Sequence, residues 1–357
     1  MDQEAPQPTS KRSRYRKNSI IVAVALVILV SVLGLTNKSL VRQGLDFISG
    51  AEYYGSGSET VTFKVSKGDT GSVIARRLVA LGVTKNIDST LRHIYAANPT
   101  FFPGVYLLPK QISTDAAIAI LTDPKQQLVN RVTVREGLRL NATFEVLSKG
   151  TGIPINSFEV EAENRQSFGL PKSAPSLEGY LYPATYDFSP GASAHDVITI
   201  MVNRTFEQLR NDAVAKKDWH KVLTLASIIQ MEARKTEDFY KVSRTFQNRI
   251  AQGMHLQSDA TVSYGVNGTT VSTSVADRND RNKYNTYLYP GLPIGPIAGS
   301  GATAIDAAIH PADGKWLYFC AINLETGETV FSNTYAEHEK AVQLWRQWML
   351  QNPGWNG

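Results

Sequence analysis

The stretch LASIIQMEARK, residues 225–235, predicts a helix that carries a glutamate on its apolar side. A helix turns by about 100° per residue, so Leu225, Ile228 and Ile229 share one face. Glu232 follows Leu225 by seven residues and returns to within about 20° of it. The opposite side, expected to face solvent, takes three polar residues: Ser227, Gln230 and Arg234. A carboxylate among apolar side chains lowers stability unless it is paired or used chemically, so Glu232 is a candidate for function.

Two consecutive helices are expected around this glutamate. The first is expected over residues 219–235, with Asp218 as its N-cap. The second is expected over residues 237–252, where Thr236 supplies the cap and Gly253 ends the helix. Apolar residues recur along it at helical spacing and predict its buried face: Phe239, Val242, Phe246 and Ile250.

The chain after these helices predicts a loop, a hairpin and a final helix. Residues 284–311 are rich in proline and glycine and run into a short helix. Residues 315–334 predict two strands around a Glu-Thr-Gly turn, and residues 335–349 predict the closing helix. Cys320 is the only cysteine of the sequence, which excludes an internal disulfide. Because its neighbours are apolar, Cys320 is expected to be a core thiol rather than a nucleophile.

Before these helices, the sequence predicts a small α+β module at residues 61–125. Val61, Phe63 and Val65 alternate as a strand, and the pair Asp69-Thr70 can cap a helix directly after it. A second helix and a second strand follow at residues 89–98 and 104–110. Residues 126–217 hold further short strands and helices, including the aromatic segment LEGYLYPATYDF. Its three tyrosines either pack in a core or line a groove for sugar rings: Tyr180, Tyr182 and Tyr186.

The N-terminal residues predict a membrane anchor. Residues 1–18 end in the basic cluster KRSRYRKN and form the expected cytoplasmic tail. Residues 19–37 contain no charged residue over about the minimum length of a spanning helix. A cleaved signal peptide would have a shorter apolar stretch and a small-residue cleavage site, and neither is evident. Residues 38–60 are then a linker, and the rest of the chain is expected to be extracytoplasmic, held at the cell membrane by one span.

Composition and motifs exclude several functions. The net charge is only +5, and no dense basic segment with interleaved aromatics follows the N-terminus, so nucleic acid is not an expected partner. The six histidines are scattered, and no metal site is expected. The sequence contains no phosphate-binding loop, no Rossmann fingerprint and no nucleophile elbow, so it predicts no cofactor and no serine hydrolase.

Glu232 is the group that remains. Burial disfavours a charged carboxyl and raises its pKa, which would let Glu232 hold a proton for a glycosidic oxygen. The alternative is a structural ion pair between Glu232 and an arginine of the next helix, either Arg244 or Arg249. Helical spacing does not separate these two interpretations.

Five segments of the chain carry a resemblance to an enzyme family. They are LASIIQMEA, KVSRTFQNRIAQGMHLQSDATVSYG, YNTYLYPGLPIGPI, AIDAAIHP and WLYF. Together they closely resemble the endolytic murein transglycosylases of the MltG/YceG-like family, over roughly residues 61–345. The pattern across residues 248–265 is long and specific. The resemblance implies an α+β catalytic domain at residues 126–350, after the anchor and the small module.

The opening of the small module carries a second resemblance. Residues 64–78, KVSKGDTGSVIARRL, resemble a LysM module, which binds N-acetylated glycans. The alternative is a Gly-Asp turn before a helix, as in any small domain.

The family resemblance implies a reaction on peptidoglycan. The family cleaves the β-1,4 bond between N-acetylmuramic acid and N-acetylglucosamine and leaves a 1,6-anhydro ring, so it is a lyase. Its catalytic glutamate falls at Glu232, which would protonate the leaving oxygen and then take the proton of the muramoyl C6 hydroxyl. Asp259 is the second candidate: it either orients Glu232 or the sugar, or caps a helix beginning at Ala260.

The resemblance also implies a substrate-binding set and a role. The implied set is Glu178, Gln257, Ser258, Asp259, Tyr264, Tyr284, Asn285, Thr286 and Tyr287. Two family features are missing: a histidine in the final hairpin, which here contains GETVFSNT, and an Asn-Pro-Gly segment, which is GSG at residues 299–301. The expected role is to terminate growing strands beside the synthases of wall elongation or division. The alternatives are a muramidase that uses water, or a scaffold that binds glycan without cleaving it.

Overall fold

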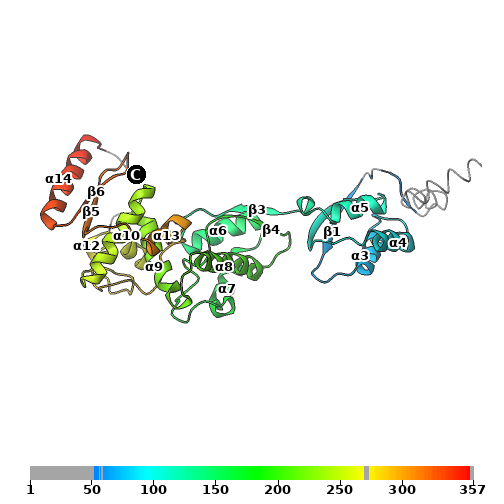
Figure 1. Ribbon diagram of the computed structural model, residues 1–357, viewed down its shortest axis with the longest axis horizontal. Helices are drawn as coiled ribbons and strands as arrows, with labels where there is room; N and C mark the ends of the chain where they lie inside the picture. Colours follow the sequence, from blue (N-terminus) through cyan, green and yellow to red (C-terminus); the bar gives the residue numbers. More distant parts are fainter. Residues whose placement is uncertain (1–51, 56, 58, 269–272, 354–357) are drawn as a thin grey trace, which may run out of the picture. The chain divides into compact units, whose positions relative to one another are not determined.

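The computed structural model describes residues 52–55, 57, 59–268 and 273–353 (Figure 1). The expected tail and membrane-spanning helix, residues 1–37, lie outside this part of the chain. Among the helices that are described, none has the length and apolar character to cross a membrane. The described chain is a mixed α+β protein, in which helices surround three two-stranded antiparallel sheets.

The chain divides into two compact units between Leu128 and Val129. The part of the smaller unit that the structure describes contains one two-stranded sheet and three helices: β1 (Thr60–Val65), α3 (Gly71–Ala80), α4 (Ile87–Ala97), β2 (Gly104–Pro109) and α5 (Thr114–Leu121), followed by the short turn η1 (Pro124–Gln126). Strands β1 and β2 pair antiparallel, with Phe63 opposite Tyr106. Both residues are fully buried, and the alternation predicted for β1 is confirmed.

Local signals explain where the helices of the smaller unit begin. Thr70 is the N-cap of α3, as predicted, and its hydroxyl accepts the N–H of Val73. The sequence did not predict α5, which Ser113 caps. Part of the expected linker also packs against this unit. The buried Glu52 accepts hydrogen bonds from the hydroxyl of Ser89 (2.7 Å) and from the backbone N–H of Thr114 (2.8 Å).

The larger unit contains the remaining elements. Those of its first half are β3 (Asn130–Thr133), α6 (Leu140–Thr151), α7 (Ile155–Glu163), η2 (Arg165–Phe168), β4 (Thr185–Phe188), α8 (Ala194–Asn211) and η3 (Lys216–Asp218). Those of its second half are α9 (Trp219–Glu232), α10 (Thr236–Ala251), α11 (Asp259–Gly265), α12 (Val275–Arg278), α13 (Ala302–Ile309), β5 (Tyr318–Asn323), β6 (Glu328–Ser332) and α14 (Tyr335–Gln351). Strand β3 pairs with β4, and β5 with β6.

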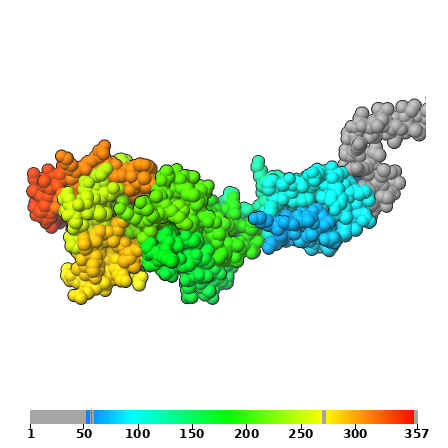
Figure 2. Space-filling view, turned by 60° about the horizontal axis from the view of Figure 1, so that its bottom comes forward, coloured from blue at the N-terminus to red at the C-terminus, as the bar shows by residue number. Residues whose placement is uncertain are grey.

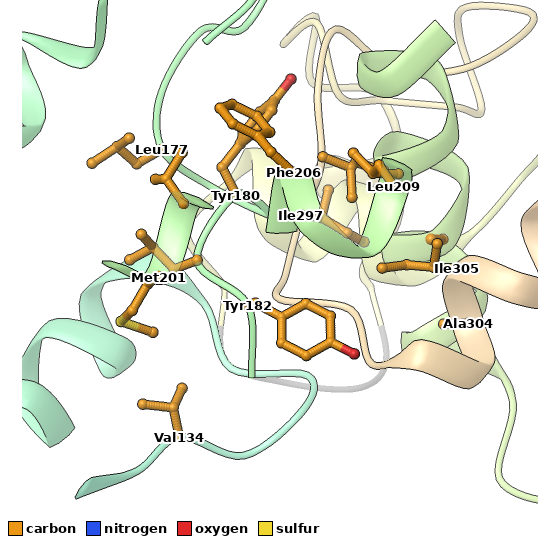
Figure 3. Close-up of a cluster of buried hydrophobic side chains, with 14 of the residues drawn as sticks. Val134, Leu177, Tyr180, Tyr182, Met201, Phe206, Leu209, Ile297, Ala304 and Ile305 are labelled. Carbon is orange, nitrogen blue, oxygen red and sulfur yellow. The ribbon is translucent and has the colours of Figure 1, made fainter. Parts of the chain in front are cut away.

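The aromatic segment before β4 lies in the core of the larger unit. Tyr180 is fully buried, and Tyr182 and Tyr186 are almost so, which confirms the core interpretation over the sugar groove. Figure 3 shows Tyr180 and Tyr182 among side chains of α8 and α13, with Phe206 beside Tyr180. The hydroxyl of Tyr186 donates to the backbone oxygen of Tyr182 at 2.6 Å.

Helix α9 runs through this core and has no solvent face along its middle turns, so the predicted solvent-facing side is wrong at Ser227 and Gln230; Arg234, which lies beyond the end of the helix, is exposed as predicted. Ser227 is fully buried: its hydroxyl donates to the carbonyl of Thr224 (2.8 Å) and accepts the N–H of Ile297 (3.0 Å). Gln230 accepts the N–H of Gly301 through its side-chain oxygen at 2.9 Å. The loop before α13, and α13 itself, cover the side that the sequence assigned to solvent.

The two predicted helices exist, but their ends differ from the prediction. Helix α9 ends at Glu232, three residues early, because Ala233 has an extended backbone (φ −91°, ψ 140°). Neither Asp218 before α9 nor Thr236 at the start of α10 makes the predicted side-chain cap. Gly253 follows α10 with φ +68°, as expected for a residue that ends a helix.

The last three elements form a hairpin with a helix against it. Helix α14 packs on β5, and its first turn is fixed by a reciprocal capping pair, Thr334 and Glu337 (Figure 1). In Figure 2 the orange and red surface of these elements adjoins the yellow-green surface of α10. Cys320 in β5 is partly buried, so it is not fully enclosed in the core as expected, and burial raises the pKa of its thiol.

Candidate active site

Glu232 lies where six segments of the larger unit meet at a pocket of about 320 Å³. The pocket is lined by Glu232, Phe246, Arg249, Leu256, Gln257, Ser258, Asp259, Tyr287, Phe319 and His338. These residues come from the end of α9, from α10, from the chain entering α11, from the loop before α13, from β5 and from α14. Only the packing of the whole unit therefore creates the pocket.

The carboxyl of Glu232 is set up to hold a proton. Burial raises its pKa, and the negative charge of Asp259 raises it further. The hydroxyl of Ser258 donates to Glu232 Oε1 at 2.5 Å and, with the positive charge of Arg249, opposes the rise without reversing it. Because Glu232 is the last residue of α9, it also lies at the negative end of that helix dipole, which disfavours its charged form.

The alternative ion pair with an arginine is not formed. Arg249 donates from Nε to the carbonyl of Leu317 (2.6 Å) and from Nη1 to that of Leu256 (2.7 Å). Arg244 donates from Nε to the carbonyl of Ala312 at 2.5 Å. Among the described residues, neither arginine makes a salt bridge with Glu232. Arg249 instead joins α10 to the start of β5 and to the chain before α11, and its positive charge lowers the pKa of Glu232.

Ser258 is held in place by a buried support beneath it. Its backbone N–H donates to the hydroxyl of Thr286 (3.1 Å), and the N–H of Gln257 donates to the carbonyl of Thr286 (3.1 Å). Gln257 takes a left-handed backbone (φ +51°), a conformation that costs a residue other than glycine about 1 kcal/mol. Thr286 and Asn285 are each 1% exposed, so they support the pocket rather than line it.

Asp259 does not cap a helix. Helix α11 begins at Asp259 itself, and Ser258 is the residue before it. One carboxylate oxygen of Asp259 accepts the hydroxyls of Tyr287 (2.9 Å) and Thr273 (2.6 Å), and Arg278 lies 3.4 Å from it. The carboxylate therefore bonds to these neighbours and acts on Glu232 by charge, and the expectation that it orients Glu232 or the sugar stays a prediction.

Three residues of the implied binding set lie away from this pocket. Glu178 is 4% exposed, accepts the backbone N–H of Leu140 at 2.9 Å and bonds to the side chain of Tyr264. Burial raises the pKa of Glu178 to about 7, against the effect of these hydrogen bonds. The rings of Tyr264 and Tyr284 lie 4.7 Å apart, and the Arg139 guanidinium stands 5.3 Å over Tyr264. These contacts tie Tyr264 of α11 to neighbouring segments and do not line the pocket of Glu232.

The structure thus brings five predicted residues together and adds others. The five are Glu232, Gln257, Ser258, Asp259 and Tyr287. Sequence reasoning considered Arg249 only as an ion-pair partner and gave His338 no role. Arg249 follows Phe246 by three residues and Val242 by seven, so its place on the buried face of α10 was a usable signal. His338 gave no such signal, because only the packing of α14 brings it to the pocket.

A carboxyl of raised pKa in a polar pocket is a candidate group for general acid–base chemistry. In the described part of the chain, no group of three His, Cys, Asp or Glu side chains is arranged to hold a metal ion. A model of the YceG-like family matches residues 63–344, and the chain belongs to that family.

The chain is also similar to individual proteins with names that are consistent with this family. The chain is 32% identical over 305 residues to an endolytic murein transglycosylase of Bacillus subtilis, covering 80% of this chain and 84% of that protein. It is 26% identical over 320 residues to a Streptococcus pneumoniae protein of the same name, covering 79% of this chain and 58% of that one. The crystal structure of a YceG-like protein from Listeria monocytogenes matches with a TM-score of 0.52 and 29% identity, covering 80% of this chain and 99% of that one.

Proposed function

We propose that the protein is a lytic transglycosylase of peptidoglycan, a lyase that uses Glu232 as its single acid and base. The observation that carries this proposal is the protonatable carboxyl of Glu232, held by Ser258 in an open pocket. The names of the Bacillus and Streptococcus relatives support the substrate class.

The proposed reaction needs no outside reagent. The proton of Glu232 passes to the glycosidic oxygen as the bond from C1 of N-acetylmuramic acid to that oxygen breaks, which frees the 4-hydroxyl of N-acetylglucosamine. The C6 oxygen of the same muramoyl residue bonds to C1 and closes the 1,6-anhydro ring. The C6 hydroxyl proton returns to Glu232, so the enzyme ends as it began.

The surroundings of Glu232 favour a mechanism with one catalytic carboxyl over a mechanism with two. A retaining glycosidase needs a second carboxylate free to attack C1, and an inverting one needs a second carboxylate free to activate water. Asp259 is the nearest candidate, but the donors Tyr287, Thr273 and Arg278 already occupy it. Its negative charge is instead placed to stabilise the positive charge that develops at C1.

Digestion of purified peptidoglycan, followed by mass spectrometry of the fragments, tests this proposal. Anhydro ends, one water lighter than hydrolysed ends, are expected. Reducing ends would instead identify a muramidase, and the absence of cleavage would identify a scaffold. Both of these outcomes contradict the proposal.

Glu232→Gln tests the assignment of the acid. The variant keeps the shape of the side chain but cannot exchange a proton, so we expect cleavage to fall at least a hundredfold while the thermal midpoint of unfolding stays the same. The control is Glu237→Gln, an exposed glutamate in the first turn of α10 that does not line the pocket, and it should keep full activity. Retained activity in Glu232→Gln would overturn the assignment.

The membrane anchor and the strand-terminating role are further parts of the proposal. The uncharged segment at residues 19–37, behind a basic tail, supports a single span with the catalytic unit outside the cytoplasm. We expect the full chain to sediment with membranes and to be cut by protease added to spheroplasts. A chain that lacks residues 1–37 should be found in the soluble fraction. Pull-down of wall synthases with the full chain tests the proposed partners.

The LysM-like module is proposed to bind the same glycan. The resemblance at residues 64–78 supports this role. In the full chain, removal of residues 61–125 should weaken binding to insoluble peptidoglycan while leaving the mass of the cleavage products the same. Unchanged binding would contradict this part of the proposal.

A further inference from the structure

His338 is a titratable residue of the pocket that the proposed chemistry does not use. It lies in the first turn of α14, far along the chain from Glu232, and it lines the same pocket. The reciprocal cap formed by Thr334 and Glu337 fixes the start of that helix, and with it the direction of the His338 side chain. Its position therefore follows from the fold and not from local flexibility.

The ring of His338 is held by stacking, and within the part of the chain that the structure describes it makes no hydrogen bond. It stacks on Tyr318 with centroids 5.3 Å apart and planes 21° apart, and it also contacts the ring of Tyr335. Its Nδ1 is closed off and has no hydrogen-bond partner among the described residues. A buried polar atom without a partner is uncommon, and functional sites are one of the places where it is kept. Because His338 is only partly buried and lines the pocket, the rest of its imidazole ring is the part available to a ligand.

The electrostatics of the pocket keep this imidazole neutral. Burial lowers the pKa of His338, and the positive charge of Arg249 lowers it further, against the weaker effect of Glu339. The same Arg249 guanidinium stands 5.3 Å from the ring of Tyr318, on which His338 stacks. A neutral imidazole can donate or accept one hydrogen bond without bringing a charge into the pocket.

We infer that His338 is a substrate-positioning residue. Its imidazole hydrogen-bonds an uncharged hydroxyl or N-acetyl group of a glycan bound in the pocket that Glu232 also lines. The inference rests on the proposed function and names one more contact of that site. Tyr318 and Arg249 fix the ring, so little side-chain freedom is lost when the sugar binds. A sugar group bonded to His338 is held at a fixed place in the pocket where Glu232 exchanges its proton.

The test compares two phenylalanine variants. His338→Phe keeps a ring to stack on Tyr318 but removes both nitrogens. The control is His195→Phe: His195 also stacks on an aromatic ring, Phe168 at 4.8 Å, but it bonds to Glu161 and lies outside the pocket. We expect His338→Phe to raise KM for peptidoglycan strands about tenfold with a smaller change in kcat, and His195→Phe to change neither.

Binding without cleavage separates this inference from the proposed function. In the Glu232→Gln background, His338→Phe should weaken binding of isolated glycan strands about tenfold. His338→Gln, whose side-chain amide can still donate and accept hydrogen bonds, should bind more tightly than His338→Phe. Strands with and without N-acetyl groups identify the group bound: a loss that disappears on de-N-acetylated strands assigns the acetamido group, and a loss that persists assigns a hydroxyl.

Two results would overturn the inference. One is binding by His338→Phe within twofold of its parent. The other is an equal loss in the His195→Phe control. If the wild-type protein binds strands but releases no anhydro ends, the proposed function is wrong. The binding assay still tests the contact of His338 in that case, because it does not depend on cleavage.

Discussion

At the scale of single residues, the site is organised around opposing effects on one proton. Burial and Asp259 raise the pKa of Glu232, whereas Ser258 and Arg249 lower it. Each of these neighbours is itself held by bonds to other segments, so the balance is a property of the fold. The sequence predicted Glu232, Ser258 and Asp259 through family resemblance, but it could not show which way each neighbour acts.

Substitutions of Ser258 and Asp259 should move the pH profile in opposite directions. Glu232 must be protonated to act as the acid, so its pKa sets the alkaline limb of kcat. Asp259→Asn removes a like charge and lowers that pKa, so the alkaline limb should move to lower pH. Ser258→Ala removes a hydrogen bond to the carboxylate and should move the limb to higher pH. Rates of anhydro-end release measured across pH check both shifts.

The control for these shifts is Asp313→Asn, because Asp313 is fully exposed and lies outside the pocket. Its alkaline limb should coincide with that of the wild type. Shifts in the same direction for the two pocket variants would contradict the proposed assignment of the limb to Glu232.

At the scale of elements, the periodicity of the sequence predicted which segments are helical, but it did not predict which faces of those helices are covered by other segments. The strand at Val61 and the hairpin around the Glu-Thr-Gly turn appear as predicted, because both depend on local pattern. The exposed side predicted for α9 failed, since α13 and the loop before it bury Ser227 and engage Gln230. Whether a helix face is buried depends on segments that are distant in the sequence, and the apolar pattern of the helix does not show which segments these are.

Gly179 shows how one element constrains another. It has φ +75°, and a Cβ added there would lie 2.7 Å from Pro296 Cγ and would press on the chain before α13. Gly191 has a similar φ of +78°, with nothing within 4 Å of an added Cβ. Gly191→Ala should cost about 1 kcal/mol of unfolding free energy from backbone strain alone. Gly179→Ala should cost about 2–4 kcal/mol, because steric overlap adds to that strain.

Urea unfolding of the two alanine variants measures this difference directly. Equal losses would show that the chain before α13 moves freely aside. In that event, the packing of the 296–298 segment would not restrict residue 179.

At the scale of the whole unit, the pocket joins residues that the sequence keeps far apart. Glu232 from α9, Arg249 from α10, Ser258 before α11 and His338 from α14 meet at one place. The first three fall within or near the family-specific stretch, so resemblance or helical phase could find them. His338 could not be found in this way, since its position depends on how α14 packs on β5.

The stability of this unit should depend on pH through Glu178. Its folded-state pKa of about 7 lies above the ordinary value of 4.5, so the folded state binds the proton more tightly. The stabilisation is then fully present below about pH 4.5 and is lost as pH rises through about 7, by about 3 kcal/mol in all. Glu178→Gln stays neutral and should remove this loss.

Urea unfolding at acidic and at mildly alkaline pH measures the effect. Wild type should lose stability between the two conditions, and Glu178→Gln should lose markedly less. Glu145→Gln, at an exposed position of α6, should behave as the wild type. An identical pH dependence in Glu178→Gln and wild type would show that Glu178 is not the group responsible.

The late position of β5 and α14 in the chain has a consequence for biosynthesis. A ribosome makes Glu232 well before Phe319 and His338, and both of these line the pocket. Until the hairpin and α14 have been synthesised and have packed, Glu232 is more hydrated, and its carboxyl lacks the full burial that raises its pKa. On the proposed function, the growing polypeptide is therefore expected to become active only after the last helix has packed on the hairpin.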